Sequence, residues 1–333
     1  MLDTATTVRE LSFGDAIKEA IAEEMRRDPT IVLMGEDVAE AGTTFKVLTG
    51  LVDEFGKDRI IDTPISEAGF TGLGVGAAMA GLRPIVDIMI GDFLTIIMDQ
   101  LVNQAAKIHY MSGGKWKVPM VIRATMGATR RSGSQHSQSL HAWTSHIPGL
   151  KVVVPSTAYD AKGLFKAAIR DDNPVVIFEH KISYRKVKDH VPAEDYIVPL
   201  GVADVKREGS DITFVATSSL VHTALGAAKM LEEVGISAEV VDPRTTWPLD
   251  EQTLIDSARK TSRCIVIDEG YGRYGVTGEL AAVIQEGAFY YLDAPVRRLG
   301  AMHVPIPFSP SLEDVTVPTE RQVFDVAREL CNK

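Results

Sequence analysis

The stretch RIIDTPISEAGFTGLGVGAAMAGLRPIVDIMI, residues 59–90, has two β-branched runs that flank a segment rich in glycine and alanine. β-Branched runs of this length are typical of strands, and the segment between them is long enough for a helix. The stretch therefore predicts a strand, a helix and a second, parallel strand. Glu67 lies where the predicted helix begins, ahead of the glycines.

The same alternation of strand-like and helical patterns extends along the whole chain. Strand-like runs lie at 31–38, 59–65, 83–90, 119–125, 151–156 and 174–179, and again at 211–218, 238–245, 263–270 and 296–301. Ser12 or Asp15 is a candidate N-cap of the first helix, and Thr157 is a candidate cap of a later one. This order of elements predicts an α/β protein with mostly parallel sheets and helices on both faces.

The length of 333 residues favours two domains. Between about 183 and 209 the pattern breaks into a polar stretch that Pro192 and Pro199 interrupt. We therefore expect a first domain over 1–190, a linker over 191–209 and a second domain over 210–333.

The composition is that of a globular protein, with 45% hydrophobic and 24% charged residues. The formal charge of −10 argues against broad binding to nucleic acids or anionic membranes. No signal peptide or long apolar segment is evident, so a cytoplasmic location is expected. The two cysteines suit a reducing compartment, with Cys264 predicted to be buried and Cys331 to be exposed.

The glycine-rich segment has two interpretations. A dinucleotide-binding turn needs a strand that leads directly into a tight glycine turn, with an acid about 20 residues later. Here Gly72, Gly74 and Gly76 recur at every second residue and alanines follow them, which favours a small-residue helix that packs closely on a sheet or a partner chain. Glu67 is likewise ambiguous, because it either complements the helix dipole or faces a ligand at the carboxyl end of a parallel strand.

Several segments resemble one enzyme family over almost the entire chain. They are MGEDVAEAG, DTPISEAGFTGLGVGAAMAGLRPI, DQLVNQAAKIHYMSGG, SQHSQSLHAW, SHIPGLKVVVPS, DAKGLFKAAIRDDNPVVIFEHK, VVDPRTTWPLD and IVIDEG. In this order they resemble the β subunit of the decarboxylating first component of 2-oxo acid dehydrogenase complexes, which depends on thiamine diphosphate. The family includes pyruvate, acetoin and branched-chain 2-oxo acid dehydrogenases. The resemblance implies a pyrimidine-binding domain followed by a domain like the C-terminal domain of transketolase.

The resemblance assigns roles to four residues. It implies that Glu67 hydrogen-bonds N1′ of the cofactor's aminopyrimidine and so promotes loss of the proton from the thiazolium C2. His136 matches a histidine that faces the reacting carbon and assists carbanion protonation or acyl transfer to a lipoyl group. Ile65 and Phe93 match positions that line the pyrimidine pocket, although both also fit an ordinary core.

The neighbouring basic residues have no role that the resemblance assigns. We expect His141 to be structural and His146 to pack or hydrogen-bond. Arg130 and Arg131 are expected to form a solvated or partner-facing basic spot, with contact to an anionic substrate as the alternative.

The segment AAIRDDN resembles the family's monovalent cation site, which suits K⁺ and uses backbone carbonyls and one acid. Its implied ligands are Met120, Ala168, Ile169, Asp171 and Asn173. A plain helix C-terminus, with Asp171 and Asn173 shaping the turn before Pro174, is compatible with the same residues.

The chain has no GDG motif, with which thiamine diphosphate enzymes hold Mg²⁺ and the diphosphate. We therefore expect it to bind only the pyrimidine half of the cofactor, and a separate α subunit to hold Mg²⁺ and the diphosphate half. The resemblance implies an α2β2 heterotetramer, with the helix after Glu67 as a candidate interface.

The second domain is expected to serve subunit association and docking onto a lipoyl acyltransferase core. The segment 304–324 suits an exposed docking surface or a plain terminal loop and helix. The substrate is expected to be a 2-oxo acid or acetoin, with a slight preference for acetoin or pyruvate. Two alternatives are a non-catalytic organising subunit and a transketolase-like or deoxyxylulose-phosphate-type half enzyme without a lipoyl partner.

Overall fold

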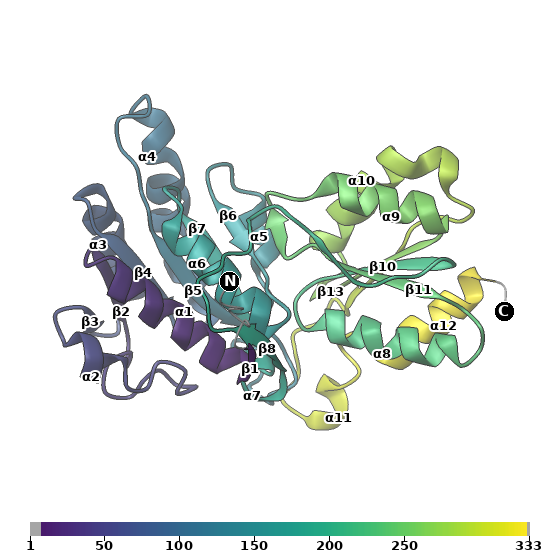
Figure 1. The fold of residues 1–333 in the computed structure, drawn as a ribbon, viewed down its shortest axis with the longest axis horizontal. Helices are drawn as coiled ribbons and strands as arrows, with labels where there is room; N and C mark the ends of the chain where they lie inside the picture. The colour runs from purple at the N-terminus through teal and green to yellow at the C-terminus, as the bar shows by residue number, and fades with distance from the viewer. Residues whose placement is uncertain (1–7, 332–333) are drawn as a thin grey trace, which may run out of the picture. The chain divides into compact units, whose positions relative to one another are not determined.

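The computed structural model describes residues 8–331, so the outermost ends of the two predicted domains lie outside the described residues. The chain divides into two compact units (Figure 1). The first comprises the residues up to 126 together with 144–200, and the second comprises 127–143 together with the residues from 201 onward. The division near 200 falls within the predicted linker, but the sequence does not predict that 127–143 belongs to the second unit.

The first unit is built on a parallel sheet. Its strands lie in the order β6 (Lys151–Val153), β7 (Val175–His180), β5 (Val121–Met126), β4 (Arg83–Ile88), β2 (Ile31–Gly35) and β3 (Ile60–Asp62). The central strands are buried on both faces, which explains their nearly unbroken apolar sequences. β1 (Val8–Ser12) and β8 (Lys188–Pro192) form a separate antiparallel pair that the sequence does not predict.

Helices cover both faces of this sheet, as predicted. One apolar cluster joins the sheet to α1 (Phe13–Arg27), α2 (Leu51–Phe55) and α6 (Ala158–Arg170). The other joins it to α3 (Glu67–Met79), η1 (Gly91–Ile96), η2 (Asp99–Ala105) and α4 (Ala106–Met111). Two short helices, α5 (His141–Ser145) and α7 (Ser183–Lys186), follow β5 and β7 along the chain.

The predicted N-caps of α1 and α6 are confirmed. The hydroxyl of Ser12 accepts a hydrogen bond from the amide of Asp15, so Ser12 rather than Asp15 is the cap of α1. The hydroxyl of Thr157 accepts one from the amide of Asp160 at the start of α6. Each cap satisfies one of the amides that a helix start leaves without a partner.

The second unit has its own sheet, in the order β14 (Arg297–Ala301), β13 (Cys264–Tyr271), β10 (Ile212–Ala216), β11 (Ala238–Asp242) and β9 (Asp204–Arg207). Only β9 runs antiparallel to its neighbour. Since β9 lies at 204–207, the predicted linker is in part an edge strand of this sheet.

One face of the second sheet packs on α8 (Leu220–Glu232) and α12 (Glu320–Leu330), and the other on α9 (Glu251–Thr261) and α10 (Val276–Ala288). Shorter elements are β12 (Thr245–Trp247), η3 (Phe289–Tyr291) and α11 (Pro310–Glu313). Cys264 is buried as predicted, whereas Cys331 is half-buried and packs against the α8 and α12 layer rather than being exposed.

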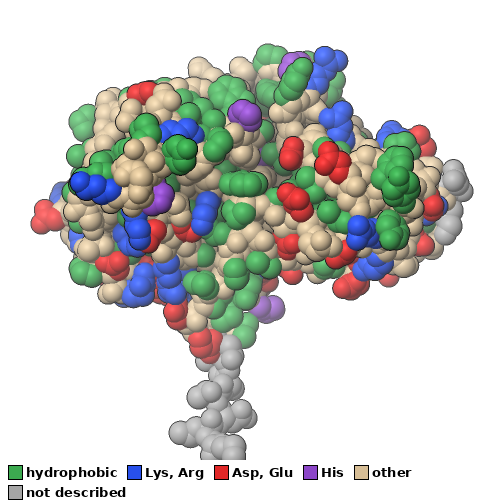
Figure 2. Space-filling view, turned by 90° about the horizontal axis from the view of Figure 1, so that it is seen from above, with side chains coloured by type: hydrophobic (Ala, Val, Ile, Leu, Met, Phe, Trp, Pro, Cys, Tyr) green, Lys and Arg blue, Asp and Glu red, His purple; other side chains and the backbone are tan. Residues whose placement is uncertain are grey.

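The molecular surface seen in Figure 2 has acidic and basic side chains interspersed, with no continuous basic patch on that face. None of the helices within 8–331 combines the length and the apolar composition that crossing a membrane requires.

Candidate active site

Glu67 is the first residue of α3, which follows β3 after a short connection. Its side chain is nearly buried, with 8% of its surface exposed. No group within residues 8–331 donates a hydrogen bond to its carboxylate. The carboxylate therefore lies near the positive end of the helix dipole, at the carboxyl end of a parallel strand, with its acceptor atoms available to a ligand.

Two further acids, neither of them predicted as a site residue, stand near the ends of neighbouring strands, and one of them, Glu36, lies close enough to Glu67 for their charges to interact. Glu36 directly follows β2, and Asp87 lies near the end of β4; β2 pairs with both β3 and β4. Burial raises the pKa of Glu36, and the negative charges of Glu67, Asp37 and Asp87 raise it further. One carboxyl oxygen of Glu36 is buried and has no hydrogen-bond partner among the described residues.

A buried arginine holds these strand ends together. Arg123 of β5 is 3% exposed and donates two hydrogen bonds to Glu179 of β7, of 2.7 and 2.6 Å, and one to Asp87 of β4. The hydroxyl of Tyr184 also donates to Glu179, at 2.7 Å. Burial raises the pKa of Asp87 to about 6; the charge of Arg123 opposes that shift and the charge of Glu179 adds to it.

The two predicted pyrimidine contacts differ in exposure. Ile65 is 84% exposed, so the alternative that it is an ordinary core residue is wrong. Phe93 lies in η1, half-buried against the apolar cluster on the α3 side of the sheet. η1 lies close to β5, because a Cβ placed on Gly91 would come within 2.1 Å of the carbonyl oxygen of Thr125. The backbone of η1, which carries Phe93, therefore packs tightly on the sheet.

His136 lies in the loop between β5 and α5, within the second unit, and is half-buried. Its amide donates to the carbonyl of Gly133 at 3.4 Å. Glu67, Ile65 and Phe93 belong to the first unit, so the predicted site residues are divided between the two units.

The structural role predicted for His141 agrees with its surroundings. His141 is fully buried, and its Nε2 lies 3.0 Å from Oδ1 of Asp268. Asp268 also accepts hydrogen bonds from the Thr217 hydroxyl and from the amide of Gly270. Burial alone would lower the pKa of His141, but the charge and hydrogen bond of Asp268 outweigh burial and raise it.

Two predictions about the neighbouring residues are wrong. His146 is exposed and forms no side-chain hydrogen bond within the described part of the chain, so it is not a packing residue of this chain. Arg131 does not form a basic spot: its side chain is 34% exposed, but its guanidinium pairs with Glu313 at 2.5 Å and with Asp314 at 2.6 Å. Arg130, in contrast, is exposed.

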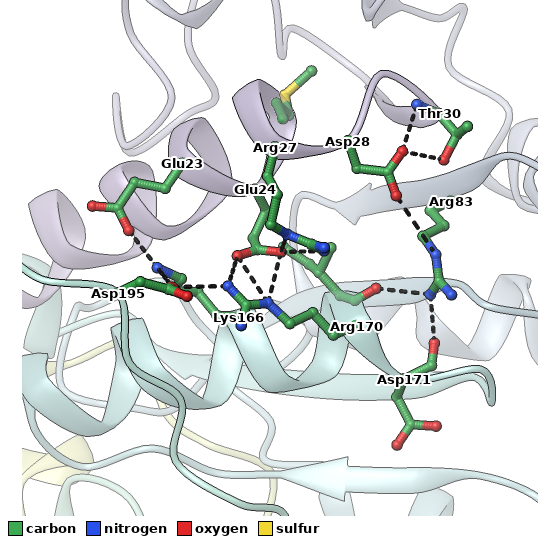
Figure 3. A network of polar contacts seen from close by, with 12 residues as sticks. Glu23, Glu24, Arg27, Asp28, Thr30, Arg83, Lys166, Arg170, Asp171 and Asp195 are labelled. Carbon is green, nitrogen blue, oxygen red and sulfur yellow. Dashed lines mark hydrogen bonds and ion pairs between the residues drawn. The ribbon is translucent and has the colours of Figure 1, made fainter.

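The predicted cation ligands gather around the C-terminal end of α6. The carbonyl of Met120 accepts from the amide of Val175, and that of Ala168 from the amide of Asp171. The guanidinium of Arg83 donates to the carbonyls of Ile169 and Asp171, at 3.0 and 2.9 Å, and Figure 3 shows it directed at the backbone of Asp171.

Charged and polar side chains also surround Asp171. Lys151 pairs with its carboxylate at 2.5 Å, and the amide of Asn173 donates to the same carboxylate at 2.8 Å. The turn predicted as the alternative to a cation site is therefore present, and two cationic side chains of the chain itself already contact these oxygens.

Comparison with known proteins identifies both units. The family "Transketolase, pyrimidine binding domain" matches residues 9–187, and "Transketolase, C-terminal domain" matches residues 201–323. The β subunit of the acetoin:2,6-dichlorophenolindophenol oxidoreductase of Bacillus subtilis is 49% identical, over 97% of this chain and 97% of that protein. The β subunit of 2-oxoisovalerate dehydrogenase from the same organism is 45% identical, over 96% and 98%.

A pyruvate dehydrogenase E1 component subunit β, from Rickettsia felis, is 46% identical over 97% of this chain and 98% of that protein. The chain belongs to this family of thiamine diphosphate-dependent dehydrogenase β subunits. Among solved structures, a "Split gene transketolase, inactive beta4 tetramer" superposes with a TM-score of 0.78 over 97% of this chain and 98% of that chain. At 24% identity, this likeness shows the fold alone.

Proposed function

We propose that the chain is the β subunit of a dehydrogenase that acts on acetoin or on a 2-oxo acid of the pyruvate type, and that Glu67 activates its thiamine diphosphate. The observation that carries this proposal is the carboxylate of Glu67. It is 8% exposed, begins α3 and has no hydrogen-bond donor within residues 8–331. A nearly buried carboxylate without a partner is costly, and a bound donor would remove that cost.

The residues fit the pyrimidine half of the cofactor. An aminopyrimidine offers N–H donors and an aromatic face, and these match the acceptors of Glu67 and the apolar side chains of Ile65 and Phe93. The buried oxygen of Glu36 that lacks a partner is a further acceptor beside Glu67. Because the 333 residues contain no GDG motif, we expect Mg²⁺ and the diphosphate to be held by an α subunit.

When bound, thiamine diphosphate supplies a carbon nucleophile and an electron sink for cleavage next to the substrate carbonyl. Glu67 shares a proton with the N1′ atom of the pyrimidine and thereby sets the tautomer of the ring. Burial at this position keeps water from competing for that proton. His136 offers an imidazole nitrogen that can give or take a proton, which suits transfer of the acyl group to a lipoyl sulfur.

The surface of α3 supports an α subunit as the partner in an α2β2 assembly. A Cβ on Gly76 would contact nothing, and one on Gly72 would meet only the side chain of Gln100. Leu73 between them is 59% exposed. Small residues beside an exposed leucine leave room for the close approach of another backbone.

Three further proposals complete this function. The acceptor of the acyl group is a lipoyl acyltransferase core. K⁺ binds at the C-terminal end of α6, and the protein is located in the cytoplasm.

The test of the proposed function uses the chain expressed with its α partner and loaded with thiamine diphosphate and Mg²⁺. Acetoin, pyruvate and 3-methyl-2-oxobutanoate are assayed with a dye acceptor, and acetoin or pyruvate should be turned over. Inactivity of the loaded complex on all three contradicts the proposal. Ketol transfer between sugar phosphates in that case would favour the transketolase-like alternative.

Glu67→Gln is the matching variant, because the amide keeps the size of the side chain but does not share a proton in the same way. We expect turnover to fall at least about 100-fold, the lower end of what general acid–base catalysis contributes. Assembly and cofactor affinity should change little. Glu40→Gln is the control, since Glu40 is an exposed residue of the same unit. Wild-type turnover in Glu67→Gln would remove the role of Glu67.

A further inference from the structure

The loop that carries His136 belongs to the second unit, and contacts within that unit hold both of its ends. It leaves β5 after Met126 and contains no helix or strand before α5 begins at His141. Residues 127–143 are nevertheless part of the compact second unit, so contacts rather than regular structure must fix their course.

Glu313 makes the contacts at the first end. This residue of α11 is fully buried, and one carboxylate oxygen accepts from the amide of Thr129 at 2.8 Å. The other accepts from the amide of Arg131 at 3.2 Å and from its guanidinium at 2.5 Å. A single carboxylate thus holds two backbone amides and one cationic side chain of a segment more than 180 residues away along the chain.

The backbone held in this way is unfavourable on its own. Thr129 has φ of +71° and Arg131 has φ of +58°, both in the left-handed region. This region is uncommon for residues other than glycine, and most of all for a β-branched residue such as threonine. Such residues persist where their surroundings fix them. The two amide contacts of Glu313 supply that restraint.

The second end of the loop is held by β13. His141, where the loop ends, pairs with Asp268. The neighbouring Glu269 of the same strand reaches the first end, where it accepts a hydrogen bond from the amide of Ala128 at 2.5 Å. His136 stands midway between Arg131 and His141, five residues from each. The course of the backbone at His136 therefore depends on both ends, and Glu313 together with Glu269 holds the first end.

We propose that Glu313 is a positioning residue for His136. It acts by holding the backbone of Thr129 and Arg131 in the left-handed conformation. This conformation sets the course of the residues that follow, up to His136. This inference rests on the proposed function, in which His136 takes part in proton or acyl transfer. A displacement of about 1 Å in a reacting group can cost on the order of 100-fold in rate. Loss of the carboxylate should therefore lower turnover without changing the affinity for substrate.

The test compares Glu313→Gln with Asp314→Asn in the complex with the α subunit. Asp314 pairs with the same guanidinium but is half-exposed and is not among the acceptors of the Thr129 and Arg131 amides. Glu313→Gln should lower kcat about tenfold or more with KM unchanged. It should also speed amide hydrogen exchange of peptides that cover 127–143. Asp314→Asn should leave both quantities near the wild-type values.

A double-mutant cycle with His136→Gln separates positioning from general destabilisation. If Glu313 acts through His136, Glu313→Gln changes the residual turnover of the His136→Gln complex by less than about twofold. Equal losses in both backgrounds, or unchanged hydrogen exchange of 127–143, would overturn the proposal. If Glu313→Gln does not fold, Glu313→Asp takes its place, because aspartate keeps the charge but cannot reach both amides. The double-mutant cycle and hydrogen exchange then test the proposal with Glu313→Asp in the same way.

Failure of the proposed function gives a different result. In that case the wild-type complex itself turns over none of the three substrates, and both the catalytic role of His136 and the positioning role of Glu313 are refuted. If the wild-type complex is active and only the variants lose turnover, the result tests the role of Glu313 alone.

Discussion

Replacing Gly76 by alanine should stabilise the free chain and weaken its assembly. Gly76 lies in the interior of α3, and an added Cβ would meet no atom within 4 Å. Alanine is preferred over glycine in a helix interior by about 0.5–1 kcal/mol, because glycine loses more backbone entropy on folding. With no clash to oppose this gain, the free energy of unfolding of the free chain should rise by that amount.

The effect on assembly should have the opposite sign. If α3 packs closely on an α subunit, the new methyl group enters a filled interface, where extra methyl groups cost about 1–3 kcal/mol. That cost corresponds to a rise of about 5-fold to 150-fold in the dissociation constant of each αβ contact. Urea unfolding of the free chain and sedimentation of α and β mixtures measure the two effects separately.

Gly74→Ala is the matched control two residues away. Its Cβ would lie 2.8 Å from a methyl group of Val86 in β4, so this variant should destabilise the free chain itself. A Gly76→Ala chain that is stabilised and still assembles with wild-type affinity would refute the interface on α3. A destabilised Gly76→Ala chain would refute the reasoning from the free space around the helix.

Two further predictions concern buried charges. Arg123→Met should lower the free energy of unfolding by about 3–5 kcal/mol, because it leaves the carboxylates of Glu179 and Asp87 buried without their cation. Lys57→Met, which breaks only the exposed pair with Glu40, should leave the free energy of unfolding near the wild-type value. If urea unfolding shows the same loss for both variants, burial of the charges is not the cause. His141→Gln tests pH dependence. Asp268 raises the pKa of His141 above 6.5, and the pKa of Asp268 lies below 3.8 because His141 and two hydrogen bonds outweigh burial. The pair should therefore stabilise most between about pH 4 and 6.5, and its contribution should shrink as the pH rises through the raised value for His141. Unfolding at pH 5.5 and 8.5 measures this, and a difference between wild type and variant that does not change with pH would exclude the linkage.

Most of the regular structure follows from local sequence. The β-branched runs at 31–38, 83–90 and 119–125 became β2, β4 and β5, because strands buried on both faces need nearly continuous apolar side chains. Ser12 and Thr157 cap their helices as predicted, since a cap depends on residues only three positions apart. The glycine-rich segment is a helix, α3, and Glu67 begins it.

The acidic residues around Glu67 could not be predicted from the sequence. Glu36 and Asp87 both stand near the ends of predicted strands, which is a usable signal, but only the strand order β4, β2, β3 makes their strands neighbours. Periodicity predicts that strands exist and does not predict which of them pair. The edge strand β9 within the predicted linker was missed for the same reason, because a short strand is defined by its partner β11.

By itself, the sequence determined two α/β units, the position of Glu67 at the start of a small-residue helix, and membership of a family whose motifs recur in order along the chain. Tertiary structure alone decided that residues 127–143 join the second unit, and that Arg123 is a buried cation between three strands. It also decided that Arg131, predicted to form a basic spot, is paired with Glu313. The physical reason is distance along the chain: caps and periodicity act over a few residues, whereas Glu313 reaches amides more than 180 residues away. Such a contact exists only once both segments have packed on the same core.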